Sequence, residues 1–220
     1  DLLSLRLDKF IGHTTSLSRA EAKKSIKKGV LVNGRIVKTP DFKIDEFKDE
    51  VIVNEEKLIY QKYIYIMMNK PKDIISATED NKTKTVVDIL DEQERIFKPF
   101  PVGRLDKDTE GLMLLTNDGD LAHKLTSPRK DIVKKYYVEV FGTIEDMHIT
   151  YFKEGAILDD GYKCKSAILD ILTSNETGSK AYIYITEGKF HQVKRMMKSI
   201  GCEVTYLKRL SIGELVLDEN

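Results

Sequence analysis

The stretch GRLDKDTEGLMLLTNDGD at residues 103–120 begins as a charged loop, continues as an apolar strand and ends in a turn. Pro99 and Pro101 precede it, which is typical of a connecting segment. Leu112-Met113-Leu114-Leu115 is a short apolar run that predicts a buried strand. The turn residues Asn117-Asp118-Gly119 predict where that strand ends.

The letters RLDK within this stretch also occur at residues 6–9, near the start of the chain. The copy at residues 6–9 leads into a predicted short helix and the other copy leads into a strand, so the two are not an internal repeat. In the second copy, Arg104 and Lys107 flank Asp106 and favour its ionised form. From residue types alone, Asp106 is either a turn residue or a functional carboxylate.

Composition predicts a globular protein, because 220 residues with 41% hydrophobic side chains can bury a sizeable core in one or two domains. No run approaches the roughly 18 apolar residues of a membrane span, and no leader resembles a signal peptide, which predicts a cytoplasmic protein. The chain does not begin with methionine, and we interpret Asp1 to Ser4 as a candidate remnant of cloning that carries no weight.

Metal and disulfide chemistry are not indicated by the cysteines and histidines. Cys164 and Cys202 lie far apart in the sequence, and the four histidines share no metal-ligand spacing with them. We therefore expect no metal site and two reduced thiols that serve packing.

The net charge of zero hides a strong local asymmetry. Residues 6–38 contain nine Lys or Arg and two acidic residues, whereas residues 39–56 contain seven Asp or Glu and two lysines. A basic segment of this kind can bind phosphates even when the whole chain is neutral.

The basic segment is predicted to form a helix. Ser18-Arg19-Ala20-Glu21 is a capping box that starts it, and Gly29 is the expected left-handed residue that ends it after Lys28. Ala22 and Ile26 share a face that can pack inward. Arg19, Lys23 and Lys27, spaced four apart, form a second face, called the basic stripe below. The stripe either contacts phosphates or is simply solvated.

The succession of RLDKF, this basic helix, GVLVNGRIV and an acidic segment with a strand at residues 51–53 resembles the S4 RNA-binding domain over roughly residues 5–58. Val30 to Val37 read as a hairpin turned at Asn33-Gly34, and a further strand is expected at residues 51–53. The resemblance implies that Arg6 and the basic stripe face RNA. It makes Asp8 a helix-start residue rather than a catalyst. We expect an S4-like domain over residues 1–59.

A second domain is predicted over residues 60–220, with an α+β fold, because strand and helix signals alternate without regular βαβ spacing. Strands are expected at residues 63–68, 112–115, 134–140, 181–186 and 213–217, and helices at residues 85–90, 121–126 and 191–200.

Four ordered blocks in this second domain resemble the RsuA branch of the pseudouridine synthases. They are YIMMNKP at 65–71, GRLDKDTEGLMLLTNDGDLAHKL at 103–125, KKYYVEV at 134–140 and EGKFHQVKRMMKSIG at 187–201. The resemblance implies a mixed, mainly antiparallel sheet with flanking helices and a central cleft. It also implies isomerisation of a uridine within RNA, without cofactor or metal.

The same resemblance assigns roles residue by residue. Asp106 matches the catalytic aspartate, and Lys194 matches the basic residue that pairs with it, with Arg195 ranked second. Tyr136 matches the tyrosine that packs against the target base, and Arg104 matches the arginine that helps hold or replace the displaced nucleotide. A carboxylate beside a cation and an aromatic face suits this chemistry.

Alternatives remain for these residues. Tyr136 could instead be one of the tyrosines that fill a face of the sheet, and Lys194 could be an ordinary surface lysine on a helix. For Asn69-Lys70-Pro71 a structural turn is the better interpretation, and for His191 a hydrogen-bonded structural role.

Two positions depart from the family pattern. Lys72-Asp73 replaces a common glycine, and Asp tolerates the left-handed conformation that the turn needs. Glu110 replaces a small residue before Gly111 and adds a negative charge near Asp106.

Positive charge around the predicted cleft favours a folded polyanion as partner. Residues 189–209 hold six Lys or Arg against one acid, and residues 124–135 hold five against one. Within the family that these blocks resemble, HQVKRMM is closer to the enzyme that acts on 16S ribosomal RNA than to its large-subunit relatives. We therefore expect a monomer that binds ribosomal RNA or an assembling small subunit, with no membrane partner. The alternatives are a large-subunit synthase, a non-enzymatic RNA-binding factor, and a hydrolase that uses Asp108 or Glu110.

Overall fold

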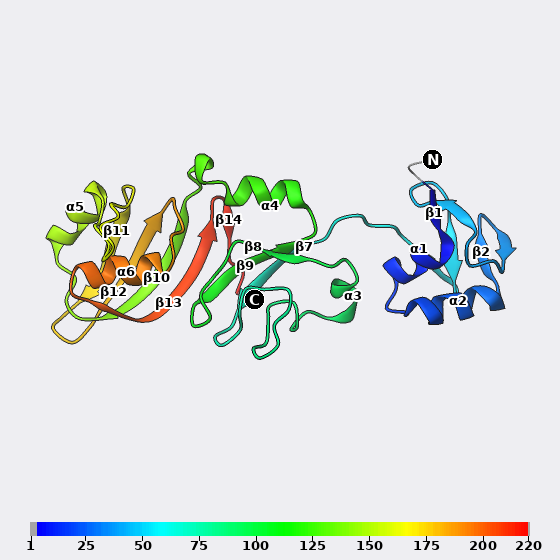
Figure 1. The fold of residues 1–220 in the computed structure, drawn as a ribbon, viewed down its shortest axis with the longest axis horizontal. Coiled ribbons are helices and arrows are strands. Elements are labelled where there is room, and N and C mark those ends of the chain that lie inside the picture. Colours follow the sequence, from blue (N-terminus) through cyan, green and yellow to red (C-terminus); the bar gives the residue numbers. More distant parts are fainter. Residues whose placement is uncertain (1–3, 220) are drawn as a thin grey trace. The chain divides into compact units, whose positions relative to one another are not determined.

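The computed structural model describes residues 4–219, which divide into two compact units (Figure 1). The first unit comprises residues 4–64 together with 90–99, and the second comprises residues 65–89 together with 100–219. The units part at residue 64, whereas the sequence predicts a domain boundary after residue 59. Each unit has its own hydrophobic core and is described by itself.

The described part of the first unit combines three helices with two small antiparallel sheets. Its sheets have the strand orders β3-β2-β5-β6 and β1-β4. The elements are β1 (Ser4–Arg6), α1 (Leu7–Thr14), α2 (Arg19–Lys28), β2 (Val30–Val32), β3 (Arg35–Val37), β4 (Lys43–Asp45), β5 (Val51–Val53) and β6 (Glu56–Leu58), with α3 (Glu92–Arg95) in the later segment.

The predicted helix and hairpin of the first unit are confirmed, but the predicted capping box and the left-handed helical residue at Gly29 are not. Ser18 Oγ accepts the N–H of Glu21 at 3.1 Å, which caps α2, although among the described residues Glu21 does not return the second bond of a capping box. Gly29 ends the helix with a φ of 105°, outside the left-handed helical region in ψ (124°). Asn33 and Gly34 have φ values of 51° and 78°, as a type I′ hairpin turn requires.

The core of the first unit explains the pattern along α2. Ala22 and Ile26 are fully buried against α1 and the sheet, whereas the side chains of the basic stripe are exposed. The copy of RLDK at residues 6–9 leads into α1, as predicted.

The second unit is built on one eight-stranded sheet with the order β11-β12-β10-β13-β9-β7, to which β8 and β14 add at β9 and β13. The strands are β7 (Tyr65–Lys70), β8 (Phe100–Val102), β9 (Glu110–Thr116), β10 (Lys134–Phe141), β11 (Ile168–Ser174), β12 (Ser179–Ile185), β13 (Glu203–Ile212) and β14 (Leu215–Val216). Among the described strands only β9 and β13 pair in parallel, so the predicted mixed, mainly antiparallel sheet is confirmed.

Gly111 makes this parallel pairing possible. It lies opposite Arg209 and has a φ of 111°. A Cβ atom at this position would lie 2.2 Å from the backbone oxygen of Arg209, a distance that no side chain can occupy. Glycine is therefore required where the two central strands meet.

Helices cover one face of this sheet. The cluster that includes Val138, Ala181 and Ile183 of the sheet packs against Phe152, of α5 (Asp146–Glu154), and Met196, of α6 (Gln192–Ser199). A third helix, α4 (Gly119–Thr126), and a 3-10 turn at Pro128–Lys130 link β9 to β10. No helix within residues 4–219 is long and apolar enough to cross a membrane.

Some predicted elements of the second unit are wrong. No helix forms at residues 85–90, because Thr85 and Asp88 bond to each other's backbone: Thr85 N–H donates to Asp88 Oδ2 at 2.8 Å, and Asp88 N–H donates to Thr85 Oγ1 at 3.2 Å. The predicted strand at 213–217 is reduced to β14, since Gly213 has a φ of 57° and turns the chain. The sequence prediction omitted β8, β11, β13 and α5.

Candidate active site

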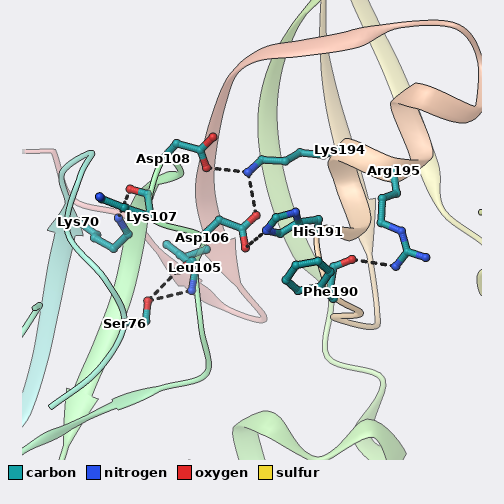
Figure 2. Close-up of polar contacts among 10 residues, drawn as sticks. All are labelled: Lys70, Ser76, Leu105, Asp106, Lys107, Asp108, Phe190, His191, Lys194 and Arg195. Carbon is teal, nitrogen blue, oxygen red and sulfur yellow. Dashed lines mark hydrogen bonds and ion pairs between the residues drawn. The ribbon is translucent and has the colours of Figure 1, made fainter. Parts of the chain in front are cut away.

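The loop between β8 and β9 carries Asp106, and α6 brings a lysine to it. Lys194 Nζ lies 3.1 Å from Asp106 Oδ2 and 2.6 Å from Asp108 Oδ1, so one ammonium group joins two carboxylates (Figure 2). The Lys194 side chain is 24% exposed, which limits solvent screening of these ion pairs. The structure thus brings together the two residues that the sequence paired.

Both Lys194 and Asp108 are held in their charged forms. Burial alone would lower the pKa of Lys194, but its hydrogen bonds to Asp108 and Asp106 raise that pKa above the usual value of 10.5. Burial alone would raise the pKa of Asp108, but the hydrogen bond from Lys194 lowers it below the usual value. The site therefore keeps a fixed positive charge beside Asp106 across neutral pH.

The backbone on the N-terminal side of Asp106 is fixed by a serine. Ser76 Oγ donates to the carbonyl of Leu105 at 3.0 Å and accepts the N–H of Leu105 at 3.0 Å (Figure 2). Ser76 is 7% exposed, so these bonds lie out of water. No signal in the sequence had marked Ser76, because its bonds go to backbone atoms that every residue carries.

The backbone after Asp106 is fixed by a buried lysine. Lys70 is fully buried, and its Nζ donates to the carbonyls of Pro71 at 2.8 Å, Ile74 at 2.7 Å and Lys107 at 3.2 Å. Burial lowers the pKa of Lys70 to about 8, against the opposing effect of nearby carboxylates. The prediction of a turn at residues 69–71 is wrong, since Asn69 and Lys70 end strand β7.

The departure from the family pattern at residue 73 is accommodated as predicted. Asp73 has a φ of 69°, in the left-handed region. Its N–H donates to the carbonyl of Lys107 at 2.9 Å, the same carbonyl that Lys70 contacts. At the second departure, Glu110 accepts the hydroxyl of Tyr206 at 2.5 Å.

His191 and Arg195 take different directions from the same helix end. His191 has a φ of 49°, stacks on Phe190 at 3.8 Å, and places Nε2 3.5 Å from Asp106 Oδ1. Arg195 instead contacts Asp159 and Asp160 at 2.8 and 3.0 Å, and the carbonyl of Phe190 at 2.9 Å. Lys194 rather than Arg195 is therefore the partner of Asp106. His191, for which the sequence favoured a structural role, also contacts the Asp106 carboxylate.

A small cavity of about 70 Å³ lies beside Asp106. Its lining includes Asp106, Lys194, His191, Tyr136 and Arg104, together with the apolar side chains of Ile185, Val193 and Leu207. Tyr136 also packs against the core, so its position serves both the sheet filler and the base-contacting interpretation.

The candidate RNA-binding residues of the first unit differ in whether an acidic side chain already pairs with them. Arg6 donates from Nε and Nη2 to Asp8 at 3.1 and 2.9 Å, and Asp8 is fully buried in the first turn of α1. Arg19 lies 3.9 Å from the same carboxylate. Lys23 and Lys27 are exposed. The copy of RLDK at residues 6–9 thus contains an internal ion pair.

Within residues 4–219 no group of three or more His, Cys, Asp and Glu side chains is arranged to hold a metal ion. Cys164 and Cys202 are buried free thiols, and burial raises the pKa of Cys164 to about 11. Both cysteines belong to the core cluster beneath the sheet.

Comparison with known proteins adds a family to this geometry. The family model described as RNA pseudouridylate synthase matches residues 64–199, and the S4 domain model matches residues 5–51. An uncharacterized RNA pseudouridine synthase of Bacillus subtilis, YtzG, is 46% identical over 215 residues, which cover 97% of this chain and 90% of the relative.

Two further matches agree. Ribosomal small subunit pseudouridine synthase A of Haemophilus influenzae is 36% identical over 98% of this chain and 92% of its own length. A crystal structure of a pseudouridylate synthase superposes with a TM-score of 0.66 at 37% identity, covering 98% of this chain and 91% of that one. A loop aspartate paired with a lysine, an S4 domain in front of it and these full-length similarities have one explanation: the chain belongs to the RNA pseudouridylate synthase family and is an RNA pseudouridine synthase.

Proposed function

We propose that this enzyme isomerises a uridine of 16S ribosomal RNA to pseudouridine, with Asp106 as the catalytic group and without a cofactor. The observation that carries the proposal is the Asp106 carboxylate, held by Lys194 at 3.1 Å at the wall of a cavity that Tyr136 also lines. The choice of 16S RNA is supported by the small-subunit enzymes that are 36% identical over nearly the whole chain.

The reaction needs few groups because it is balanced within one nucleotide. The bond from ribose C1′ to N1 of uracil breaks, the base rotates, and a bond from C1′ to C5 forms. The proton on C5 leaves and N1 gains one, so no oxidant or reductant enters. A charged carboxylate can act by attack on the sugar or the base, or by removing a ribose proton, and each route uses Asp106 in its ionised form.

Neighbouring side chains have supporting tasks in this proposal. Lys194 keeps a positive charge beside Asp106, and Tyr136 stacks on the extruded base, which offsets part of the few kcal/mol that unstacking costs. Arg104, exposed in the same loop, occupies the place of the displaced nucleotide. Arg195 contributes through Asp159 and Asp160 rather than through Asp106.

The first unit is proposed to bind the same RNA through the basic stripe of α2. The protein is proposed to act as a monomer. The partner is ribosomal RNA or the assembling small subunit. Arg6 contributes less directly, since Asp8 already holds its guanidinium group.

The test is a map of pseudouridines in ribosomal RNA. Cells that lack the protein should lose one pseudouridine in 16S RNA, and the wild-type gene should restore it while a gene encoding Asp106→Asn should not. Loss of a site in 23S RNA instead would make this a large-subunit synthase. An unchanged map, with defective subunit assembly, would leave an RNA-binding factor and overturn the proposal.

A further inference from the structure

A second, larger cavity adjoins the one beside Asp106. Its volume is about 450 Å³, which lies in the range of small-ligand sites. Both cavities are lined by Arg104, Tyr136, Gly188 and Lys189, so they share one wall. A chain of RNA with its target base beside Asp106 would therefore place its neighbouring nucleotide at or near this larger space.

The lining of the larger cavity is strongly basic. It contains five cationic side chains and one acid, Glu187. The cations are Arg104, Lys134, Lys165, Lys189 and Arg209. The carboxylate of Glu187 is already used: it accepts the hydroxyl of Tyr162 at 2.6 Å, the N–H of Lys165 at 2.8 Å and the side-chain amide of Gln192 at 3.0 Å. The cavity therefore has an excess of positive charge suited to an anion.

Arg209 and Lys134 are the two cations whose surroundings show the cost of this charge most clearly. Arg209 is 5% exposed; its Nε donates to the carbonyl of Leu112 at 2.9 Å, and its buried Nη2 has no hydrogen-bond partner among residues 4–219. Burial and the charge of Arg209 both lower the pKa of Lys134. Two neighbouring positive charges, one of them with an unpaired and buried nitrogen, are costly, and an anion in the cavity would offset the charge of both. The other acid nearby, Asp131, is bound to Lys165 at 2.7 Å.

Apolar side chains also line this cavity, namely those of Val102, Leu114, Leu125, Pro128 and Ile212, beside the hydroxyl groups of Thr126, Ser127 and Thr186. A phosphate alone would pair with the cations and leave the apolar side chains without a contact. A nucleotide combines an anionic group for the cations with a flat base for the apolar side chains.

We propose that this cavity is a subsite for the nucleotide that adjoins the target uridine, with its phosphate at Lys134 and Arg209 and its base against the apolar side. This inference rests on the proposed function, because it takes its ligand from the RNA that places a uridine at Asp106.

Adjacent lysines on β10 provide a matched pair of variants. Lys134 lines the cavity, whereas Lys135 lies over the ring of Tyr182 at 4.1 Å, outside this lining. Lys134→Gln and Lys135→Gln remove the same charge, one residue apart. Arg209 is too deeply buried for a safe substitution, so Lys134 carries the test. Circular dichroism of both variants should match that of the wild type, which checks that they are folded.

The first measurement uses the RNA fragment that pseudouridine mapping identifies. Lys134→Gln should weaken its binding roughly tenfold, as expected for a charge-assisted hydrogen bond, and Lys135→Gln should change it little. Replacing the phosphate on one side of the target by a neutral methylphosphonate, or the neighbouring base by an abasic residue, should weaken binding to the wild type. The methylphosphonate should add almost nothing to Lys134→Gln. Equal losses in both lysine variants, or a methylphosphonate effect independent of residue 134, would overturn the subsite.

A second measurement does not depend on the reaction. Titration of the dinucleotide uridylyl-uridine should shift NMR signals of Val102, Leu125 and Ile212, and less so in Lys134→Gln. If the wild type makes no pseudouridine but these shifts occur, the proposed function fails and the subsite stands. If pseudouridine forms normally in Lys134→Gln and no shift appears in the wild type, the subsite fails alone. A shift confined to Tyr136 and His191 would mean that only the target nucleotide is bound.

Discussion

Nζ of Lys194 contacts the carboxylate of Asp106 at 3.1 Å from a helix that lies far along the chain. The same ammonium group is closer to Asp108, at 2.6 Å. Asp108 is 66% exposed at its side chain and Asp106 is 29% exposed, so the tighter contact is on the solvent side. Asp108 thus holds the lysine at the entrance of the site while Asp106 remains available to a substrate.

Replacing Lys194 with Met should lower the single-turnover rate, and the loss should deepen as pH falls. Without the ammonium group, Asp108 loses the hydrogen bond that lowers its pKa, and Asp106 loses the positive charge 3.1 Å from its carboxylate. An ionised Asp106 is needed for every route considered. The measurement is single-turnover rate against pH on the mapped RNA. Lys198→Met, an exposed position on the last turn of the same helix, is the control for lost charge. A rate loss of the same size at every pH would argue that Lys194 only supports the fold.

Asp106→Asn should abolish isomerisation and leave RNA affinity nearly unchanged. The amide keeps the shape of the side chain but cannot act as base or nucleophile. The check is pseudouridine formation at saturating RNA beside equilibrium binding of the same RNA. Substantial turnover by this variant would remove Asp106 from its proposed role.

Ser76→Ala should reduce the rate about tenfold without changing the shape of the pH profile. The substitution leaves the buried N–H and carbonyl of Leu105 unpaired, which costs about 1–3 kcal/mol and loosens the backbone next to Asp106. Rate, RNA affinity and thermal unfolding should be measured on one preparation. Ser76→Thr, which retains the hydroxyl, should restore most of the rate. A Thr variant as slow as the Ala variant would show that packing at residue 76, rather than the two hydrogen bonds, sets the rate.

The pairing of Asp106 and Lys194 was predictable because both residues lie in blocks that resemble a known family. Ser76 and Lys70 were not, since their bonds end on backbone carbonyls and amides, which leave no pattern in the side chains. A lysine with no exposed surface also contradicts the usual preference of that residue for water. Only the fold shows that three carbonyls lie around Nζ of Lys70 and accept its hydrogen bonds.

The prediction of secondary structure failed where local polar hydrogen bonds or a buried charge interrupted the pattern of apolar residues. Thr85 and Asp88 close a turn on each other, so an apolar segment that suits a helix does not form one. Strand β13 was missed because Arg209 interrupts its apolar alternation. That arginine is buried because its Nε reaches the carbonyl of Leu112 on the parallel neighbour, a partner that no local window contains.

Asp8→Asn should destabilise the first unit at neutral pH and leave chemistry at saturating RNA intact. Burial would raise the pKa of Asp8, but hydrogen bonds from Arg6 and from the N–H of Lys9 hold it below its usual value of 3.8. A lowered pKa in the folded state gives stability that is present above about pH 4 and is lost as pH falls through the folded-state value. The difference between wild type and variant should therefore be largest near pH 7 and shrink below pH 4.

Hydrogen exchange of the amides of α1 in the full chain measures this difference at each pH. A loss of isomerisation rate at saturating RNA would contradict the structural reading of the RLDK copy at residues 6–9. A stability difference that grows in acid would mean that the Arg6 pairing does not stabilise the charged carboxylate.

Replacing Arg19, Lys23 and Lys27 together with Gln should weaken RNA binding without slowing chemistry at saturating RNA. Each phosphate contact contributes roughly 0.7 to 0.9 to the slope of log K against log salt, so the slope should fall by up to about three contacts' worth. Arg19 lies 3.9 Å from Asp8, so its share should be the smallest of the three. The control replaces Lys43, Lys48 and Lys57 of the same unit with Gln. These lysines lie outside α2, and their replacement removes the same amount of charge. Salt-dependent affinity and single-turnover rate on one ribosomal RNA fragment provide the comparison. Equal slopes in the two triple variants would mean that α2 contributes only its charge to the general field, and the basic stripe would lose its role as an RNA contact.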